Sequence, residues 1–203
     1  MKNAKKLTKL AMLTAVAIAV YWAESRLPPI APVPGIKLGL ANAVTLFVLI
    51  CYGAPSAAMV SLGRILLGGF AAGSFSTLLY SLAGGAVSLA VMAVVYNALR
   101  AGNAEYNALR AGNASADAER GKAANAPRFR SQKPTSRLTT ASVFAGAVGG
   151  TAHNIAQLSV AVAVTETPEL FAYLPILIIA GVVTGAFTGL CAGYAARRLE
   201  DVL

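Results

Sequence analysis

Long stretches without a charged side chain are the feature that most constrains this sequence. No Asp, Glu, Lys or Arg occurs between Arg64 and Arg100, and residues 138–165 are equally free of charge. Charged residues make up only 12% of the chain, whereas a soluble domain carries about a quarter. One soluble core could not cover so many apolar segments, but helices in a bilayer satisfy their own backbone hydrogen bonds. The sequence therefore predicts an all-α integral membrane protein.

Six apolar segments are the predicted membrane-spanning helices. The first segment follows four lysines, as in a signal peptide, but it ends in Glu24-Ser25-Arg26-Leu27-Pro28-Pro29 without a small-residue cleavage site. We interpret it as a retained span, and the chain as a single multi-pass domain of the cell (plasma) membrane. The expected spans are residues 7–26, 38–53, 55–71, 74–96, 141–164 and 174–196.

The distribution of basic residues predicts the orientation. If both termini are cytoplasmic, 14 of the 17 Lys and Arg residues lie on the inside. The acidic segment 165–173 then lies outside. Because cytoplasmic loops are enriched in Lys and Arg, this orientation is strongly favoured.

The segment 97–138 differs from the rest of the chain. It is basic, and the sequence Tyr-Asn-Ala-Leu-Arg-Ala-Gly-Asn-Ala at 96–104 recurs at 106–114. Two copies are too few for a solenoid. We therefore expect a disordered cytoplasmic linker with a local duplication, whose charge reflects topology and not nucleic-acid binding.

Polar side chains within the apolar spans are the candidate ligand-binding groups, because each is costly in lipid unless it faces a cavity or a partner. A structural alternative stays open: Arg64 could pair with Glu24 to hold helices together, and His153 could bond a neighbouring carbonyl. A metal site is not expected, since the chain has one histidine and no Cys pair at ligand spacing. The candidate substrate-binding residues are Glu24, Lys37, Asn42, Arg64, Ser81, His153, Asn154 and Gln157.

Small residues recur every fourth position in two spans. Gly181, Gly185, Gly189 and Gly193 predict a smooth face for close helix packing. Ala11, Ala15 and Ala19 form a similar ladder in the first span. The spacing alone leaves open whether the alanines pack within the protein or dock a partner.

Several motifs together resemble those of the Gx transporter family, whose members are often described as heptaprenyl diphosphate synthase component I. The resemblance covers nearly all of 7–96 and 141–196, but not the long segment between them. The motifs are Pro34-Gly35-Ile36-Lys37-Leu38-Gly39-Leu40-Ala41-Asn42, the flanking Glu24 and Arg64, Tyr80-Ser81-Leu82-Ala83-Gly84-Gly85, and Ala152-His153-Asn154-Ile155-Ala156-Gln157.

That family is in turn similar to the substrate-binding S components of energy-coupling factor transporters. The resemblance implies a six-helix bundle that captures a vitamin or cofactor precursor from outside. It also implies that Ala11, Ala15 and Ala19 dock a transmembrane coupling subunit, and that the loop 26–37 covers the site. Two cytoplasmic ATPases would drive transport, since this chain has no phosphate-binding Gly-x-x-x-x-Gly-Lys-Ser/Thr loop.

We therefore expect a non-enzymatic capture subunit that binds no covalent cofactor and relies on a partner for any use of ATP. Flavin-like, thiamine-precursor, quinone-precursor and isoprenoid ligands all stay open. The alternative is a membrane accessory subunit of heptaprenyl diphosphate synthesis. Catalysis by this chain alone is not expected, because prenyl elongation needs clustered aspartates to hold Mg²⁺, and only Asp117 and Asp201 are present.

Overall fold

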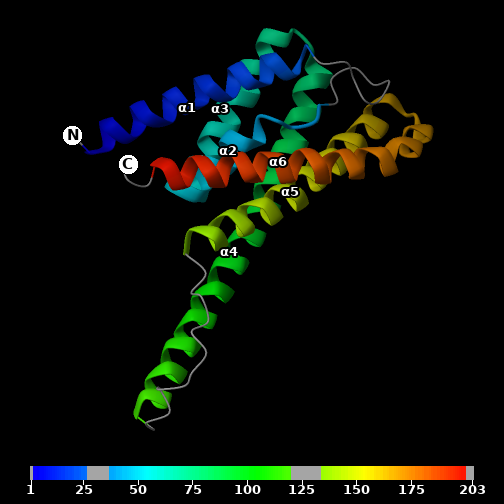
Figure 1. Ribbon diagram of the computed structural model, residues 1–203. Helices are drawn as coiled ribbons and strands as arrows, with labels where there is room; N and C mark the ends of the chain where they lie inside the picture. Colours follow the sequence, from blue (N-terminus) through cyan, green and yellow to red (C-terminus); the bar gives the residue numbers. More distant parts are fainter. Residues whose placement is uncertain (1, 27–36, 120–133, 200–203) are drawn as a thin grey trace.

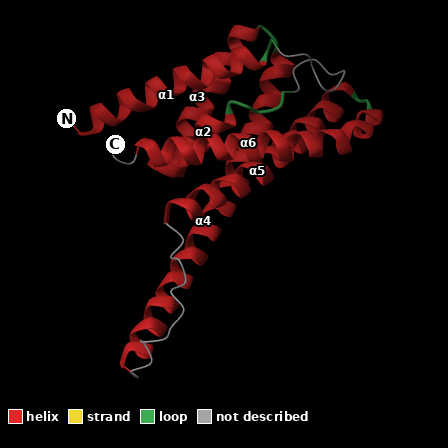
Figure 2. Ribbon diagram, viewed as in Figure 1, coloured by secondary structure: helices red, strands yellow, loops and turns green. Residues whose placement is uncertain are grey.

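The computed structural model describes residues 2–26, 37–119 and 134–199, and within these ranges all regular structure is helical (Figure 2). The all-α membrane class is thus confirmed. The elements are α1 (Lys2–Glu24), α2 (Asn42–Tyr52), α3 (Ala54–Ala72), α4 (Phe75–Glu119), α5 (Pro134–Thr165), the 3₁₀ helix η2 (Pro168–Tyr173) and α6 (Leu174–Leu199).

Five of the six α-helices are long and apolar enough to cross a membrane. The exception is α2, which has only 11 residues. At a rise of about 1.5 Å per residue it covers roughly half of the hydrocarbon core. The second predicted span, 38–53, therefore needs correction at its start, because residues 37–41 are not α-helical and the helix begins at Asn42.

The N-terminal end of α1 and the C-terminal end of α6 lie at the same end of the bundle (Figure 1). The turn from α5 through η2 into α6 lies at the opposite end. This arrangement agrees with two termini on one side of the membrane. The cytoplasmic assignment of that side stays a prediction.

The helix α4 runs far out of the bundle (Figure 1). The expectation of a disordered linker from residue 97 is therefore wrong for residues 97–119, which continue α4. Alanine, leucine, arginine and glutamate recur there without a proline, and these residues favour helix even without tertiary contacts. The helical start of α5 at Pro134 likewise shortens the linker. The expectation for residues 120–133 lies outside the described residues.

Glycines hold α5 and α6 in direct backbone contact. A Cβ added to Gly185 would lie 2.2 Å from the carbonyl oxygen of Gly146, and one added to Gly181 would lie 2.9 Å from that of Gly150. Gly189 meets the Ser142 carbonyl oxygen in the same way, whereas Gly193 meets the Ser142 hydroxyl and the Thr139 backbone. The predicted packing role of this glycine ladder is confirmed, and it fits the close approach that small residues allow in membranes.

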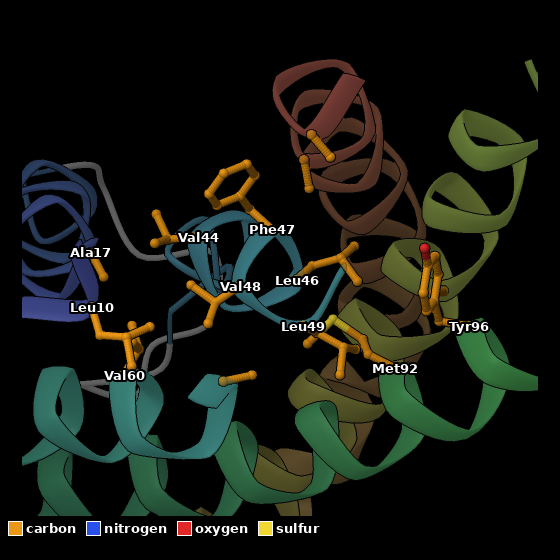
Figure 3. Packing of buried hydrophobic residues seen from close by; sticks show 14 of the residues in the cluster. Leu10, Ala17, Val44, Leu46, Phe47, Val48, Leu49, Val60, Met92 and Tyr96 are labelled. Carbon is orange, nitrogen blue, oxygen red and sulfur yellow. The ribbon is translucent and has the colours of Figure 1, made fainter. Parts of the chain in front are cut away.

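The short helix α2 forms the centre of the main hydrophobic core. Leu46 and Val48 are fully buried. Figure 3 shows them with Leu10 of α1, Val60 of α3 and Met92 of α4 around them. In the non-helical segment 37–41 that leads into α2, Gly39 and Ala41 are buried as well.

Candidate functional site

Residues 37–41 form a short non-helical connection into α2, which we call the strap. Gly39 of the strap has φ +79°, a left-handed conformation that glycine adopts without penalty. A Cβ at this position would also lie 2.9 Å from Asn42 Nδ2 and 3.0 Å from His153 Cδ2. Both conformation and space therefore require glycine here.

The carboxylate of Glu24, at the end of α1, binds the strap backbone. Its Oε1 accepts the N–H of Gly39 at 2.6 Å, and its Oε2 accepts the N–H of Leu40 at 3.1 Å. Glu24 itself is only 5% exposed. Charged acceptors make stronger hydrogen bonds than neutral ones, so this contact fixes the strap to α1.

Lys37 connects the strap to two further elements. Its backbone N–H donates to Oε1 of Gln157 on α5 at 3.1 Å. Its ammonium group donates to Ser25 Oγ and lies 3.2 Å from the centroid of the Tyr21 ring, a cation–π arrangement. The half-buried Lys37 thus holds the C-terminal end of α1 against the strap.

These contacts have a common physical cause. Non-helical backbone at membrane depth is tolerated only where protein or water satisfies its polar groups. Glu24 and Gln157 supply three acceptors for strap N–H groups, and the hydroxyl of Thr184 on α6 lies 3.4 Å from the Leu38 carbonyl oxygen. Several of the predicted site residues therefore support the backbone that leads into α2.

A second polar group links α2, α3 and α4. Arg64, 3% exposed, donates to Asn42 Oδ1 at 3.4 Å, and Asn42 Nδ2 donates to Ser88 Oγ at 3.3 Å. Among the described residues, no direct ion pair joins Arg64 to Glu24, although the two side chains attract each other electrostatically. The alternative of a helix-to-helix salt bridge is therefore not what the structure contains.

His153 lies between two glycines, one in the strap and one in α4. Added Cβ atoms would lie 3.0 Å from the imidazole at Gly39 and 2.8 Å at Gly84. The next residue, Asn154, donates to the carbonyl oxygen of Leu177 at 2.7 Å. In the described part of the chain, His153 Nδ1 and Asn154 Oδ1 have no hydrogen-bond partner.

The structure thus brings five of the eight predicted residues into two hydrogen-bonded groups, Glu24, Lys37 and Gln157 at the strap and Asn42 with Arg64 beside it. His153 packs against Gly39 of the strap, and Asn154 bonds the backbone of α6 instead. Ser81 is buried on α4, but the described residues show no side-chain hydrogen bond from it to the others. Ser88 was among the hydrogen-bonding groups expected within the spans, but the sequence did not single out Tyr21 or Thr45 for the site. Both carry a hydroxyl within an apolar helix and are buried, the same signal that selected Asn42.

The alanine ladder of α1 faces outward. Ala11, Ala15 and Ala19 are exposed, whereas Leu10, Ala17 and Tyr21 form the buried face of this helix. These alanines do not pack within the described bundle. Their docking role stays a prediction, as does the loop 26–37 as a cover, because residues 27–36 lie outside the described part of the chain.

The sequence profile of the heptaprenyl diphosphate synthase component I family matches residues 13–105 and 131–195. The chain belongs to that family. The matched regions contain the strap and most of each helix around it, and they leave out residues 106–130. Searches of curated proteins and of solved structures find no significant match. The similarity to S components of energy-coupling factor transporters therefore rests on the sequence motifs alone.

Metal binding finds no support in the residues described, where no three His, Cys, Asp or Glu side chains come together. The site chemistry is instead that of hydrogen-bond donors and acceptors around one guanidinium and one carboxylate. Such a set can recognise a polar small molecule in an apolar surrounding.

Proposed function

We propose that this chain is the substrate-binding subunit of a small-molecule uptake transporter. The observation that carries the proposal is the set of buried polar side chains around the strap, part of which lacks partners within the described chain. Intramembrane ionisable residues are costly and usually mark a ligand or ion pathway. A purely structural bundle would need the carboxylate of Glu24 for the strap, but not an under-partnered guanidinium beside it.

In this proposal the two groups have different roles. Glu24, Lys37 and Gln157 position the strap, and Arg64, Asn42, His153 and Asn154 bind the captured molecule. The exposed alanine face of α1 supports a transmembrane coupling subunit as partner, because small side chains allow close helix approach. ATP hydrolysis would then belong to the partner.

The test is ligand binding by variants that remove the proposed contacts. Small molecules that co-purify with the wild-type protein would be identified by mass spectrometry and rebound to the stripped protein. We expect Arg64→Ala combined with His153→Ala to lose most of this binding. Equal affinity in the double variant and the wild type would refute the assignment. The control is Arg198→Ala, at an exposed position near the C-terminal end of α6.

The second candidate is an accessory subunit of heptaprenyl diphosphate synthesis, which the family description favours. It would hold or deliver an isoprenoid for a catalytic partner. A prenyl diphosphate as the co-purifying ligand, together with a soluble prenyltransferase, would support this candidate over the transporter subunit.

A further inference from the structure

Three buried polar atoms without a hydrogen-bond partner lie where α1, α2 and α3 meet. They are the hydroxyl oxygen of Tyr21, Oγ1 of Thr45 and Nε of Arg64, all unpartnered within the described residues. An unsatisfied buried polar group destabilises the folded state. Three such groups at one helix junction need a physical explanation.

Two contacts and the register of α2 place these three side chains near one another. Arg64 donates to Asn42, and Thr45 lies three residues further along α2, on the same helix face as Asn42. The Tyr21 ring packs against Gly68, one turn beyond Arg64 on α3, where an added Cβ would lie 2.9 Å from the ring.

Lys37 and Arg64 both interact with the single carboxylate of Glu24, so two cationic side chains face one anionic side chain here. Among the described residues, Arg64 donates a hydrogen bond to the neutral amide oxygen of Asn42, and both oxygens of Glu24 accept strap N–H groups. The N-terminus of α2 begins here at Asn42, and no side chain caps it. A helix N-terminus adds partial positive charge, so the guanidinium and the helix end together favour an anion.

We propose that Arg64, Tyr21 and Thr45 form a subsite for one anionic group, a carboxylate or a phosphate, of the captured molecule. The inference rests on the proposed function and names the chemical class of the substrate. The guanidinium offers Nε–H to one anionic oxygen, and the two hydroxyls donate to the others. An anion there satisfies all three unpartnered groups and balances the buried charge.

Removal of the two hydroxyls distinguishes a ligand-binding role of these side chains from a structural role. Because neither hydroxyl has a partner, Tyr21→Phe and Thr45→Val are expected to leave the unfolding midpoint of the ligand-free protein unchanged or slightly raised. Each is expected to weaken anion binding about 2- to 10-fold, the usual effect of one lost hydrogen bond. A clear fall in the midpoint of the ligand-free variants would show that the hydroxyls serve the fold, and would overturn the proposal.

The experiment is thermal unfolding of the purified full-length protein in detergent, with benzoate, phenyl phosphate or benzyl alcohol. We expect stabilisation by at least one anion, little by the neutral alcohol, and a loss of about 10- to 100-fold in apparent affinity in Arg64→Gln. Arg198→Gln is the charge-matched control and is expected to behave as wild type. The stronger of the two anions identifies the acidic group.

Two outcomes would overturn the subsite. One is equal stabilisation by the alcohol and the anions, or no stabilisation by any of the three compounds. The other is unchanged anion affinity in Arg64→Gln and in the Tyr21→Phe, Thr45→Val double variant. The proposed transporter function fails separately, if anions bind as expected but cells carrying the protein take up no ligand that co-purifies with it.

Discussion

Glu24 and Gly39 are joined by a 2.6 Å hydrogen bond from the Gly39 N–H to Oε1, so the end of α1 holds the backbone that leads into α2. The second oxygen of the same carboxylate accepts the N–H of Leu40. One side chain thus provides acceptors for two adjacent buried N–H groups. This arrangement explains how a helix of only 11 residues can begin inside the bundle.

Glu24→Gln is expected to loosen the strap, because an amide has one acceptor oxygen and turns its NH₂ group towards the other N–H. Hydrogen–deuterium exchange of residues 37–41 should rise about tenfold or more, corresponding to the loss of one charged hydrogen bond. Glu169→Gln, an exposed glutamate in η2, is the control and should leave the exchange unchanged. Unchanged exchange in Glu24→Gln would contradict the proposed positioning role.

Gly84→Ala is expected to disturb the site, since its Cβ would lie 2.7 Å from Gln157 Cγ and 2.8 Å from His153. We expect a loss of about 1–3 kcal/mol in stability, as for other overpacked cores, and weaker ligand binding. The matched variant is Gly102→Ala on the same helix, where nothing lies within 4 Å of the new Cβ. That variant should stabilise α4 by roughly 0.5–1 kcal/mol. Equal unfolding midpoints of the two variants would contradict the packing described here.

Gly185→Val is expected to separate α5 from α6. Even the first added carbon would lie 2.2 Å from a backbone oxygen, and backbone cannot move aside as a flexible side chain can. Unfolding in detergent should show a loss of more than about 3 kcal/mol, or no folded protein. Val183→Leu, on the exposed face of the same helix, should change the stability little.

The number of helices and the close packing of the α6 glycines could be predicted from the sequence, because both depend on local periodicity. The strap could not. Its geometry depends on the positive φ of Gly39 and on Glu24, which is fifteen residues earlier in the chain. Tyr21 and Thr45 carry the same sequence signal as Asn42, a polar side chain within an apolar helix, but only the structure shows that their hydroxyls lack partners among the described residues. The full length of α4 was not predicted, because the polar composition of its end indicated a linker although its alanines favour helix.

Ala15→Leu is expected to abolish association with a coupling subunit without changing ligand binding or stability. Ala15 is exposed on α1, so leucine fits in the isolated protein but prevents close approach of a partner helix. Co-purification from the native membrane is the measurement, and Val94→Leu, at an exposed position on α4, is the control. Association that survives in Ala15→Leu would show that this face meets only lipid.

Deletion of residues 106–114, the second copy of the repeat, is expected to leave ligand binding and membrane insertion unchanged. The segment lies on the part of α4 that extends beyond the bundle, and the family match ends at residue 105 before it resumes at 131. Binding of the co-purifying ligand and the unfolding midpoint are the measurements. A loss of binding in the deletion variant would assign a function to the repeat.

Native mass spectrometry of the protein released gently from its own membrane tests the central claim most directly. The account predicts a bound small molecule with one acidic group, present in wild type and absent in Arg64→Gln, with or without a coupling subunit and its ATPases. A prenyl diphosphate retained equally by both proteins, together with a soluble prenyltransferase, would contradict it and favour the accessory-subunit function.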